Sequence, residues 1–243
     1  MRQQFRIVGA VATAGICVLG LSSCGSLTGE TFTDDAKVPE KITSVRLDSS
    51  SGGVTLNGGK NTGDVSLHRS VTYHSKKPSG ATHRVDNGVL VLGGCGRDCS
   101  VDYSVDLPAG LPVTGGTSSG AVRLVDVGPV EVNTSSGHIE MDEVAGTVDV
   151  ETSNGRITGT GLRGKGIRAK TSNGSITLTP VTAQDVRAET SNGEIRITAP
   201  TARYTVKARS DNGERKINIP TDPSGQYELD LRTSNGAITV DAA

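Results

Sequence analysis

Short runs of alternating apolar and polar residues fill the second half of the chain, and each run meets the same polar phrase. Four strict copies of Thr-Ser-Asn-Gly and three looser ones occur, beginning at Thr152, Thr171, Thr190 and Thr233 and at Thr117, Thr134 and Ser210. Their glycines lie 17 to 23 residues apart and are Gly120, Gly137, Gly155, Gly174, Gly193, Gly213 and Gly236. A period of about 19 residues indicates a repeat architecture.

The residues on either side of each glycine predict two strands per repeat. Val148, Val150 and Thr152 alternate with charged residues before Gly155, and apolar residues alternate again after it. Such alternation is typical of strands buried on one face. The intervening charged residues should face solvent, and they include Asp149, Glu151, Arg168, Lys170, Arg187, Glu189 and Arg196. Asn-Gly supplies the positive φ angles of tight corners, so the seven glycines are predicted to be structural turn residues.

Two folds fit this alternation. Asn-Gly between alternating strands also predicts antiparallel hairpins, which would place Thr190 opposite Ile195. In a parallel solenoid each repeat is one coil and like residues stack on like, which explains the near-identity of successive copies. We therefore predict an all-β chain, folded as a single-stranded β-solenoid of about 19-residue coils.

Some parts of the chain depart from the regular pattern. Earlier copies at Ser50–Leu56 and Asp86–Leu92 are more widely spaced, so the amino-terminal portion should be a less regular version of the same design. Gly213 is followed by three charged residues, Glu214 to Lys216, where an apolar residue belongs. This departure predicts a bulge or local distortion in that coil.

The start of the chain has the pattern of an export signal. Arg2 and Arg6 precede an apolar stretch that is short for a membrane span, and the stretch ends in Leu21-Ser22-Ser23-Cys24. This junction resembles the bacterial lipobox, which implies cleavage after residue 23 and a diacylglyceryl and palmitate anchor on Cys24. The alternative is an ordinary secretory signal with an incidental cysteine.

Residues 24–40 are polar and aperiodic, and they predict a flexible tether ahead of a solenoid domain at 41–243. Removal of the signal lowers the 25 basic residues to 23, against 26 acidic ones. This near-neutral balance argues against a nucleic-acid partner.

Cys95 and Cys99 are the remaining cysteines after the signal and Cys24 are set aside. Outside the cytoplasm, such a pair is expected to form a disulfide, which stabilises by about 2 kcal/mol in the chain-entropy model. A metal site is not favoured, because two thiols supply half a zinc shell. A redox site is not favoured either, because the spacing is not Cys-x-x-Cys.

Candidate chemistry elsewhere is sparse. Asp126 and Glu143 occupy equivalent places in adjacent coils and are candidates for an acid/base pair, although exposed carboxylates are more typically solvating charges. The histidines, His68, His74, His83 and His138, have no nucleophile motif near them. We expect no catalytic residue, no metal and no cofactor. The asparagines of the strict copies, Asn154, Asn173, Asn192 and Asn235, are either a turn-forming ladder or a repeated binding surface.

Together, the lipobox, the Ser50–Leu56 start, the segment Val101–Gly110 and the string of coils resemble the bacterial putative-adhesin domain of unknown function 4097. The resemblance runs from about Ile42 to Val240. It implies a β-solenoid and carries no catalytic residues with it.

These observations favour a non-enzymatic, lipid-anchored cell-surface protein that acts as a binding, adhesion or spacer module. Its partners would be the membrane, through the lipid, and an envelope polymer or a surface protein. Two alternatives remain: a carbohydrate-active β-helix enzyme, and an accessory protein-binding module in envelope signalling.

Overall fold

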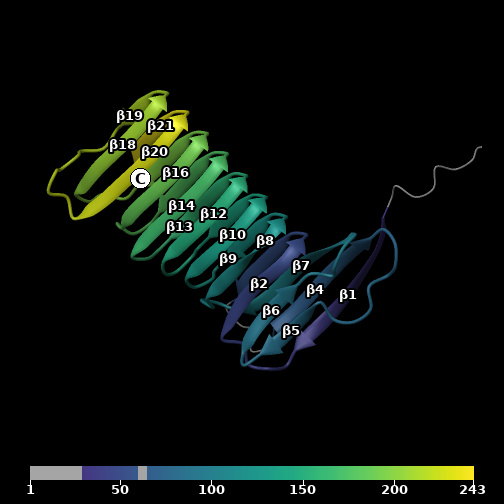
Figure 1. Ribbon diagram of the computed structural model, residues 1–243. Coiled ribbons are helices and arrows are strands. Elements are labelled where there is room, and N and C mark those ends of the chain that lie inside the picture. Colours follow the sequence, from purple (N-terminus) through teal and green to yellow (C-terminus); the bar gives the residue numbers. More distant parts are fainter. Residues whose placement is uncertain (1–28, 60–64) are drawn as a thin grey trace, which may run out of the picture.

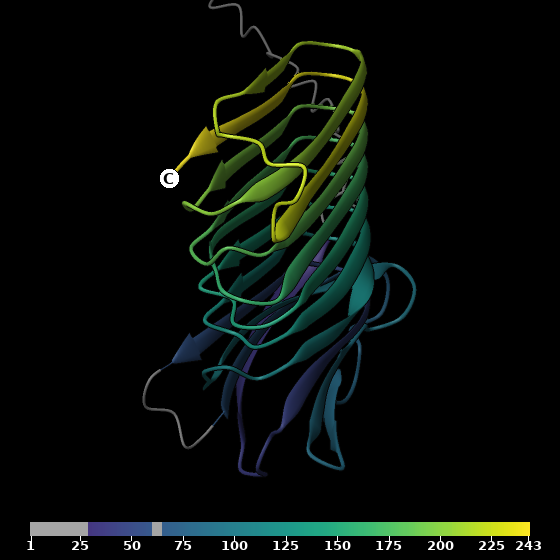
Figure 2. The ribbon, with the colours of Figure 1, turned by 90° about the vertical axis from the view of Figure 1, so that its left-hand side faces the viewer.

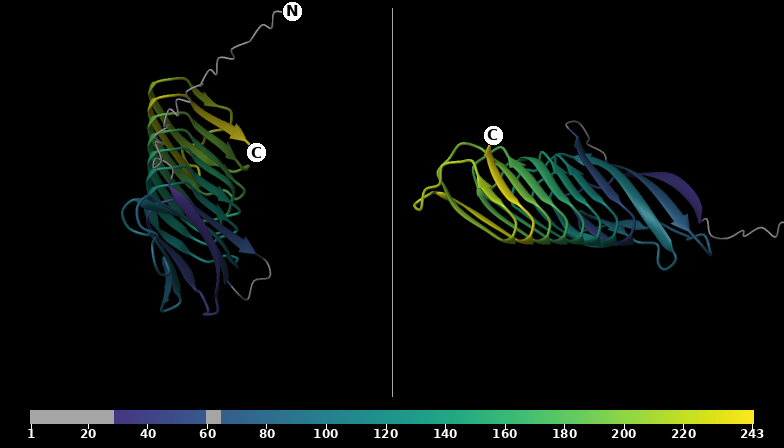
Figure 3. Two further views of the ribbon diagram at one scale, coloured as in Figure 1. Left: turned by 90° about the vertical axis from the view of Figure 1, so that its right-hand side faces the viewer. Right: turned by 90° about the horizontal axis from the view of Figure 1, so that it is seen from above.

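The computed structural model describes residues 29–59 and 65–243, and every regular element in these ranges is a β-strand. Two sheets of eleven and ten strands lie face to face and form an elongated stack (Figures 1 and 3). In spatial order the first sheet consists of β1 (Glu30–Val38), β4 (Val65–Tyr73), β7 (Cys99–Pro108), β3 (Val54–Gly59), β9 (Val122–Val125), β11 (Ile139–Asp142), β13 (Ile157–Leu162), β15 (Ile176–Pro180), β17 (Ile195–Ala199), β21 (Ile238–Ala242) and β19 (Arg215–Ile217).

The second sheet carries the strands that precede the glycine corners. In spatial order it consists of β18 (Tyr204–Asn212), β20 (Tyr227–Asn235), β16 (Asp185–Asn192), β14 (Gly166–Asn173), β12 (Val148–Asn154), β10 (Val130–Ser136), β8 (Val113–Ser119), β2 (Ser44–Ser51), β6 (Val89–Gly93) and β5 (His83–Asp86). Each coil runs along a strand of this sheet, turns at its glycine and returns along a strand of the first sheet (Figure 2).

The pairing confirms the β-solenoid. Strands of successive coils are parallel, with Thr152 in register with Thr171 and Asn154 with Asn173. The hairpin alternative is wrong for the Thr-Ser-Asn-Gly copies, because the strands before and after each of them lie in different sheets: β16 pairs with β14 and β20, and β17 with β15 and β21. Like residues therefore stack on like residues through the regular part of the chain.

A single apolar core lies between the two sheets. Side chains at alternate positions, such as Val150, Ala169 and Ile176, are almost wholly buried, while Asp149 and Arg168 on the same strands face solvent. Burial of one Val, Leu or Ile side chain contributes roughly 1.5–3 kcal/mol, so the stability of the stack comes mainly from this narrow interior. The period-two pattern of the sequence thus corresponds to the alternation of core-facing and solvent-facing side chains in each coil.

The last two coils are not stacked in chain order. The C-terminal coil of β20 and β21 pairs with β16 and β17 on one side and with β18 and β19 on the other, so it is inserted between them (Figure 1). The predicted bulge after Gly213 is replaced by a different explanation. Glu214, Arg215 and Lys216 belong to the outermost coil, where one side of the strand faces solvent and charged residues are tolerated.

The amino-terminal end is built in the same way. The coil of β2 and β3 is inserted between the coil of β8 and β9 and the coil of β6 and β7, although β6 and β7 follow it in the chain. At both ends, the coil nearest the chain terminus is therefore paired on two sides. Chain ends fray when they are not tied down, and at the C-terminal end this insertion holds β20 and β21 between two neighbouring coils.

Two expectations for the amino-terminal portion are corrected. The segment predicted as a tether contains β1, which pairs antiparallel with β4 over its full length from Glu30 to Val38. Its alternating residues Phe32 and Ala36 pack on the core, which a purely polar reading of the segment overlooked. The Asp86 copy is a hairpin turn between β5 and β6, with Asn87 and Gly88 at φ of 49° and 80°.

Candidate binding surfaces of the solenoid

The glycine column marks a close approach between successive coils. A Cβ on Gly155 would lie 1.9 Å from the carbonyl oxygen of Gly137, and a Cβ on Gly193 would lie 1.9 Å from that of Gly174. All seven predicted turn glycines stack in this way, each with a neighbouring carbonyl at 1.9 to 2.1 Å from its would-be Cβ. The column continues beyond them to Gly52, whose carbonyl faces Gly120.

This geometry corrects the predicted reason for glycine. Among the seven, only Gly120, Gly174 and Gly236 have φ in the region that favours glycine, at 140°, 154° and 149°. Gly193 does not, so its requirement is steric clearance between coils rather than a left-handed backbone. All seven lie at corners of the coils, and for most of them the reason for glycine is the close approach of the neighbouring coil rather than φ.

The threonine column stabilises the same corners. The hydroxyl of Thr171 donates to the carbonyl of Gly155 at 3.0 Å, and Thr152, Thr190 and Thr233 make the equivalent bond at the same distance. These threonines are 1–4% exposed, so the bonds lie at the edge of the core. Thr117 and Thr134 differ: the hydroxyl of Thr117 donates to the carbonyl of Ser119 at 3.3 Å, and the buried hydroxyl of Thr134 has no partner among the described residues.

The asparagine column is a continuous ladder of side-chain amides on the surface. Asn173 donates from Nδ2 to Oδ1 of Asn154 at 2.9 Å, Asn192 to Asn173 at 3.0 Å and Asn235 to Asn192 at 3.0 Å. Asn212 of the outermost coil adds a fifth rung, at 3.1 Å to Asn235. Each amide keeps a second N–H that these bonds do not use.

The four predicted asparagines are therefore brought together, and Asn212 is the member that sequence reasoning missed. It lies in the loosest copy of the phrase, Ser210–Gly213, although Asn-Gly is retained there. In the opposite direction the ladder gives way to serines, with Ser136 in register with Asn154 and Ser119 in register with Ser136. Serine is thus compatible with this position of the coil.

The two carboxylates singled out in the sequence mark a different corner. Asp126 and Glu143 have φ of 51° and 55°, and Gly161 of the next coil has 65°. Glu143 is ion-paired with Arg163. These three residues form a left-handed bend at the ends of β9, β11 and β13, so a structural role accounts for their position.

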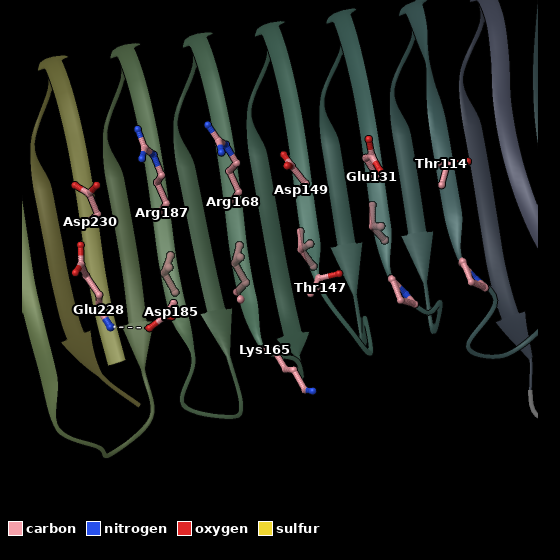
Figure 4. Close-up of a pocket in the computed structure, with 17 residues that line it drawn as sticks. Thr114, Glu131, Thr147, Asp149, Lys165, Arg168, Asp185, Arg187, Glu228 and Asp230 are labelled. Carbon is pink, nitrogen blue, oxygen red and sulfur yellow. Dashed lines mark hydrogen bonds between the residues drawn. The ribbon is translucent and has the colours of Figure 1, made fainter. Parts of the chain in front are cut away.

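A shallow groove of about 800 Å³ crosses the outer face of the second sheet near the strand starts (Figure 4). The alternating sequence pattern predicted that Asp149, Arg168 and Arg187 face solvent, but it did not reveal the groove. Along it, side chains from successive coils form one row: Thr114, Glu131, Asp149, Arg168, Arg187 and Asp230. Lys165, Asp185 and Glu228 line its lower margin in Figure 4.

A polar cluster centred on Arg69 links the strands at the amino-terminal end of the stack. Arg69 of β4 makes a bidentate pair with Asp34 of β1, at 2.5 and 2.7 Å, and also donates to the hydroxyl of Thr82 at 3.0 Å. The guanidinium of Arg69 holds the pKa of the Asp34 carboxyl below its usual value. Burial raises the pKa of the nearby Tyr103 phenol and lowers that of the His83 imidazole. The cluster joins β1, β4 and the segment before β5.

Cys95 and Cys99 form a disulfide, with Cα atoms 6.0 Å apart. It closes the bend before β7. Cys24, the predicted lipid site, lies outside the described residues.

Within 29–59 and 65–243, no three His, Cys, Asp or Glu side chains gather as a metal site would require. No helix in those ranges is long and apolar enough to cross a membrane.

The fold and its repeated corners match a known family model. The Toastrack DUF4097 model matches residues 36–243, which is most of the chain. The chain belongs to the Toastrack DUF4097 family. Its resemblance to the domain of unknown function 4097 is thereby confirmed. No curated protein matches the chain.

Solved structures with a similar arrangement are distant in sequence. A putative adhesin from Parabacteroides distasonis has 14% identity and a TM-score of 0.46, with 88% of this chain and 98% of that chain covered. A putative cell adhesion protein from Clostridium sporogenes has 13% identity and a TM-score of 0.41, with 88% and 100% covered. A putative adhesin from Bacteroides fragilis has 14% identity and a TM-score of 0.38, with 88% and 97% covered.

Proposed function

We propose that this Toastrack protein is a non-enzymatic, lipid-anchored surface protein whose repetitive solenoid face binds an envelope polymer or a surface protein. The observation that carries the proposal is the exposed amide ladder from Asn154 to Asn212. It repeats one hydrogen-bonding group about every 4.8 Å along the stack. Contacts that are weak singly become strong when several engage at once, as a polymer with many equivalent groups permits.

The position of the amino terminus supports the anchoring part of the proposal. β1 is the edge strand at one end of the stack, and β18 and β19 are the edges at the other end. Cys24 precedes Glu30 by six residues, a length that spans at most about 20 Å. A lipid on Cys24 would therefore hold the β1 end at the membrane and leave the opposite end free to project.

The anchor is tested by Cys24→Ala. This variant should lose palmitate labelling and should escape the lipoprotein peptidase, because the acylated sulfur is absent. Labelling that is unchanged in the variant would contradict the proposed anchor.

The binding role is tested by a pull-down from cell envelope prepared from cells that lack this protein. The full chain carrying Cys24→Ala should retain envelope material. A second bait adds Asn→Ser at Asn154, Asn173, Asn192 and Asn235, a replacement that the serines of the earlier coils show to fit the corner. Retention should fall clearly with this bait. Undiminished retention would remove the ladder as the binding surface.

The non-enzymatic part has its own test. Turnover of a polysaccharide panel that is lost in Asp126→Asn or Glu143→Gln would overturn it. We expect no turnover by the parent chain, because those carboxylates form the left-handed bend and Glu143 is paired with Arg163.

A further inference from the structure

The charged row in the groove places residues of like charge next to each other on adjacent strands. Glu131 and Asp149 are in register on adjacent strands, and so are Arg168 and Arg187 (Figure 4). Like charges side by side on neighbouring strands are destabilising. Among the described residues, only Arg187 of these four has an oppositely charged group within 4.0 Å, namely Glu189 at 3.8 Å. These four residues are two negative charges followed by two positive charges, and Asp230 ends the row in register with Arg187.

This order is complementary to itself when it is reversed. A two-fold axis parallel to the strands, between β12 and β14, would lay two copies of this face against each other with their coils in opposite order. Glu131 would then face Arg187 of the second copy, Asp149 would face Arg168, and Asp230 would face the uncharged Thr114. An isologous contact of this kind needs one self-complementary patch, and the row is such a patch.

We propose that this face binds a second copy of the chain, with the coils of the two copies in opposite order; this arrangement is called antiparallel below. The inference rests on the proposed surface-binding function and names one partner for it. Each arginine would pair with a carboxylate of the other copy. This pairing would weaken the repulsion between the two arginines of one chain and between the two carboxylates of the other.

The neighbouring row agrees with the same axis. Glu151 and Lys170 flank it and form an ion pair at 3.1 Å within one chain, so two copies would bring four alternating charges together. Farther out, Asp48 would face Arg209 of the second copy. The like-charged pair of Arg46 and Lys207 falls at the ends, where Lys207 is already neutralised by Glu228 at 2.9 Å.

The antiparallel orientation has a consequence for attachment. The β1 ends of the two copies would lie at opposite ends of the pair, because the coil order is reversed. With each chain anchored near β1, the pair would connect two membrane surfaces rather than lie within one. Each contact would be weak, and many pairs acting together between two surfaces would supply the strength.

Sedimentation of the full chain carrying Cys24→Ala, in mild detergent, tests the pairing. At about 10 mM salt the wild-type face should give an average mass that rises toward two chains with concentration. At about 1 M salt it should return to one chain, because the screening length falls from about 30 Å to about 3 Å. A mass of one chain at every concentration in low salt would overturn the proposal.

Block variants make the test specific. Arg168→Glu/Arg187→Glu makes all four central residues of the row carboxylates, and Glu131→Arg/Asp149→Arg makes all four cations. Each should remain a single chain alone, and an equimolar mixture should restore the two-chain mass. Arg123→Glu, a reversal on the outer face of the other sheet, should pair like the wild type. A mixture that stays monomeric, or block variants that pair alone, would refute the charge register.

Cysteine pairs fix the orientation. Ser118→Cys mixed with Ser234→Cys should form a disulfide between chains, because β8 of one copy faces β20 of the other. Ser118→Cys alone should not cross-link, and if it does the copies are parallel and the proposal is wrong. The readout is separate from the envelope pull-down, since that envelope contains no copy of this chain. Wild type that is monomeric but binds polyphosphate through Arg168 and Arg187 would identify a polyanion site and overturn the pairing.

Discussion

At the residue scale, one corner of the coil combines three side-chain requirements. Glycine leaves room for a carbonyl of the adjacent coil, threonine donates to that same carbonyl, and asparagine bonds to its own counterpart on the surface. The repeated Thr-Ser-Asn-Gly motif is therefore explained by contacts between coils rather than by a local turn preference. The corner was predictable from the sequence, but the reason for its glycine was not, because φ at Gly193 depends on how the coils stack.

Gly193→Ala tests the close approach. Its Cβ would lie 1.9 Å from the Gly174 carbonyl, so the coils must separate, and we expect a loss of about 1–3 kcal/mol in the free energy of unfolding. Gly166→Ala is the matched control, because its nearest contact is 3.8 Å away. Equal stability of the two variants in urea melts would contradict the packing explanation.

Thr171→Val tests the hydroxyl bond with almost no change of shape. The carbonyl of Gly155 would lose its 3.0 Å donor, which should cost about 1–3 kcal/mol. The same change at Thr134 removes a buried hydroxyl that has no partner and should be neutral or stabilising. If Thr134→Val lowers the free energy of unfolding more than Thr171→Val does, this explanation of the threonine column is wrong.

At the element scale, the coil order departs from the chain order at both ends. The signal for the C-terminal exchange was present in the sequence. The three strict copies at Thr152, Thr171 and Thr190 are followed in space by the fourth strict copy at Thr233, while the loose copy at Ser210 lies outermost. Similarity between copies tracks spatial adjacency, because like residues must stack. The amino-terminal hairpin and β1 had no such signal, since antiparallel strands do not repeat the phrase.

Cysteine pairs test the C-terminal order. Asn192→Cys/Asn235→Cys places two thiols on neighbouring strands and should form a disulfide on mild oxidation. Asn192→Cys/Asn212→Cys places them two strands apart and should not. Mass analysis after proteolysis distinguishes the two, and the opposite pattern would mean that the coils stack in chain order.

At the scale of the whole molecule, repetition sets both the shape and the surface. The sequence predicted an all-β solenoid with charged residues outside and no catalytic cluster, and the fold and family are confirmed. The groove and its charged row were not predicted, because they require knowing which coils are neighbours. From the sequence, Arg168 and Arg187 are ordinary solvent-facing residues, and their place in one row emerges only when the strands are placed side by side.

The central claim is that the surface binds by repetition, and a graded series measures it most directly. Chains with one, two, three and four of Asn154, Asn173, Asn192 and Asn235 changed to Ser should be compared for binding to the same envelope preparation. One change should barely alter the apparent affinity, because the remaining contacts still hold the polymer. Three changes should weaken it clearly, because affinity for a polymer depends on how many contacts engage at once. Loss of all binding from one particular change would indicate a single discrete site. A flat series would show that the ladder takes no part in binding.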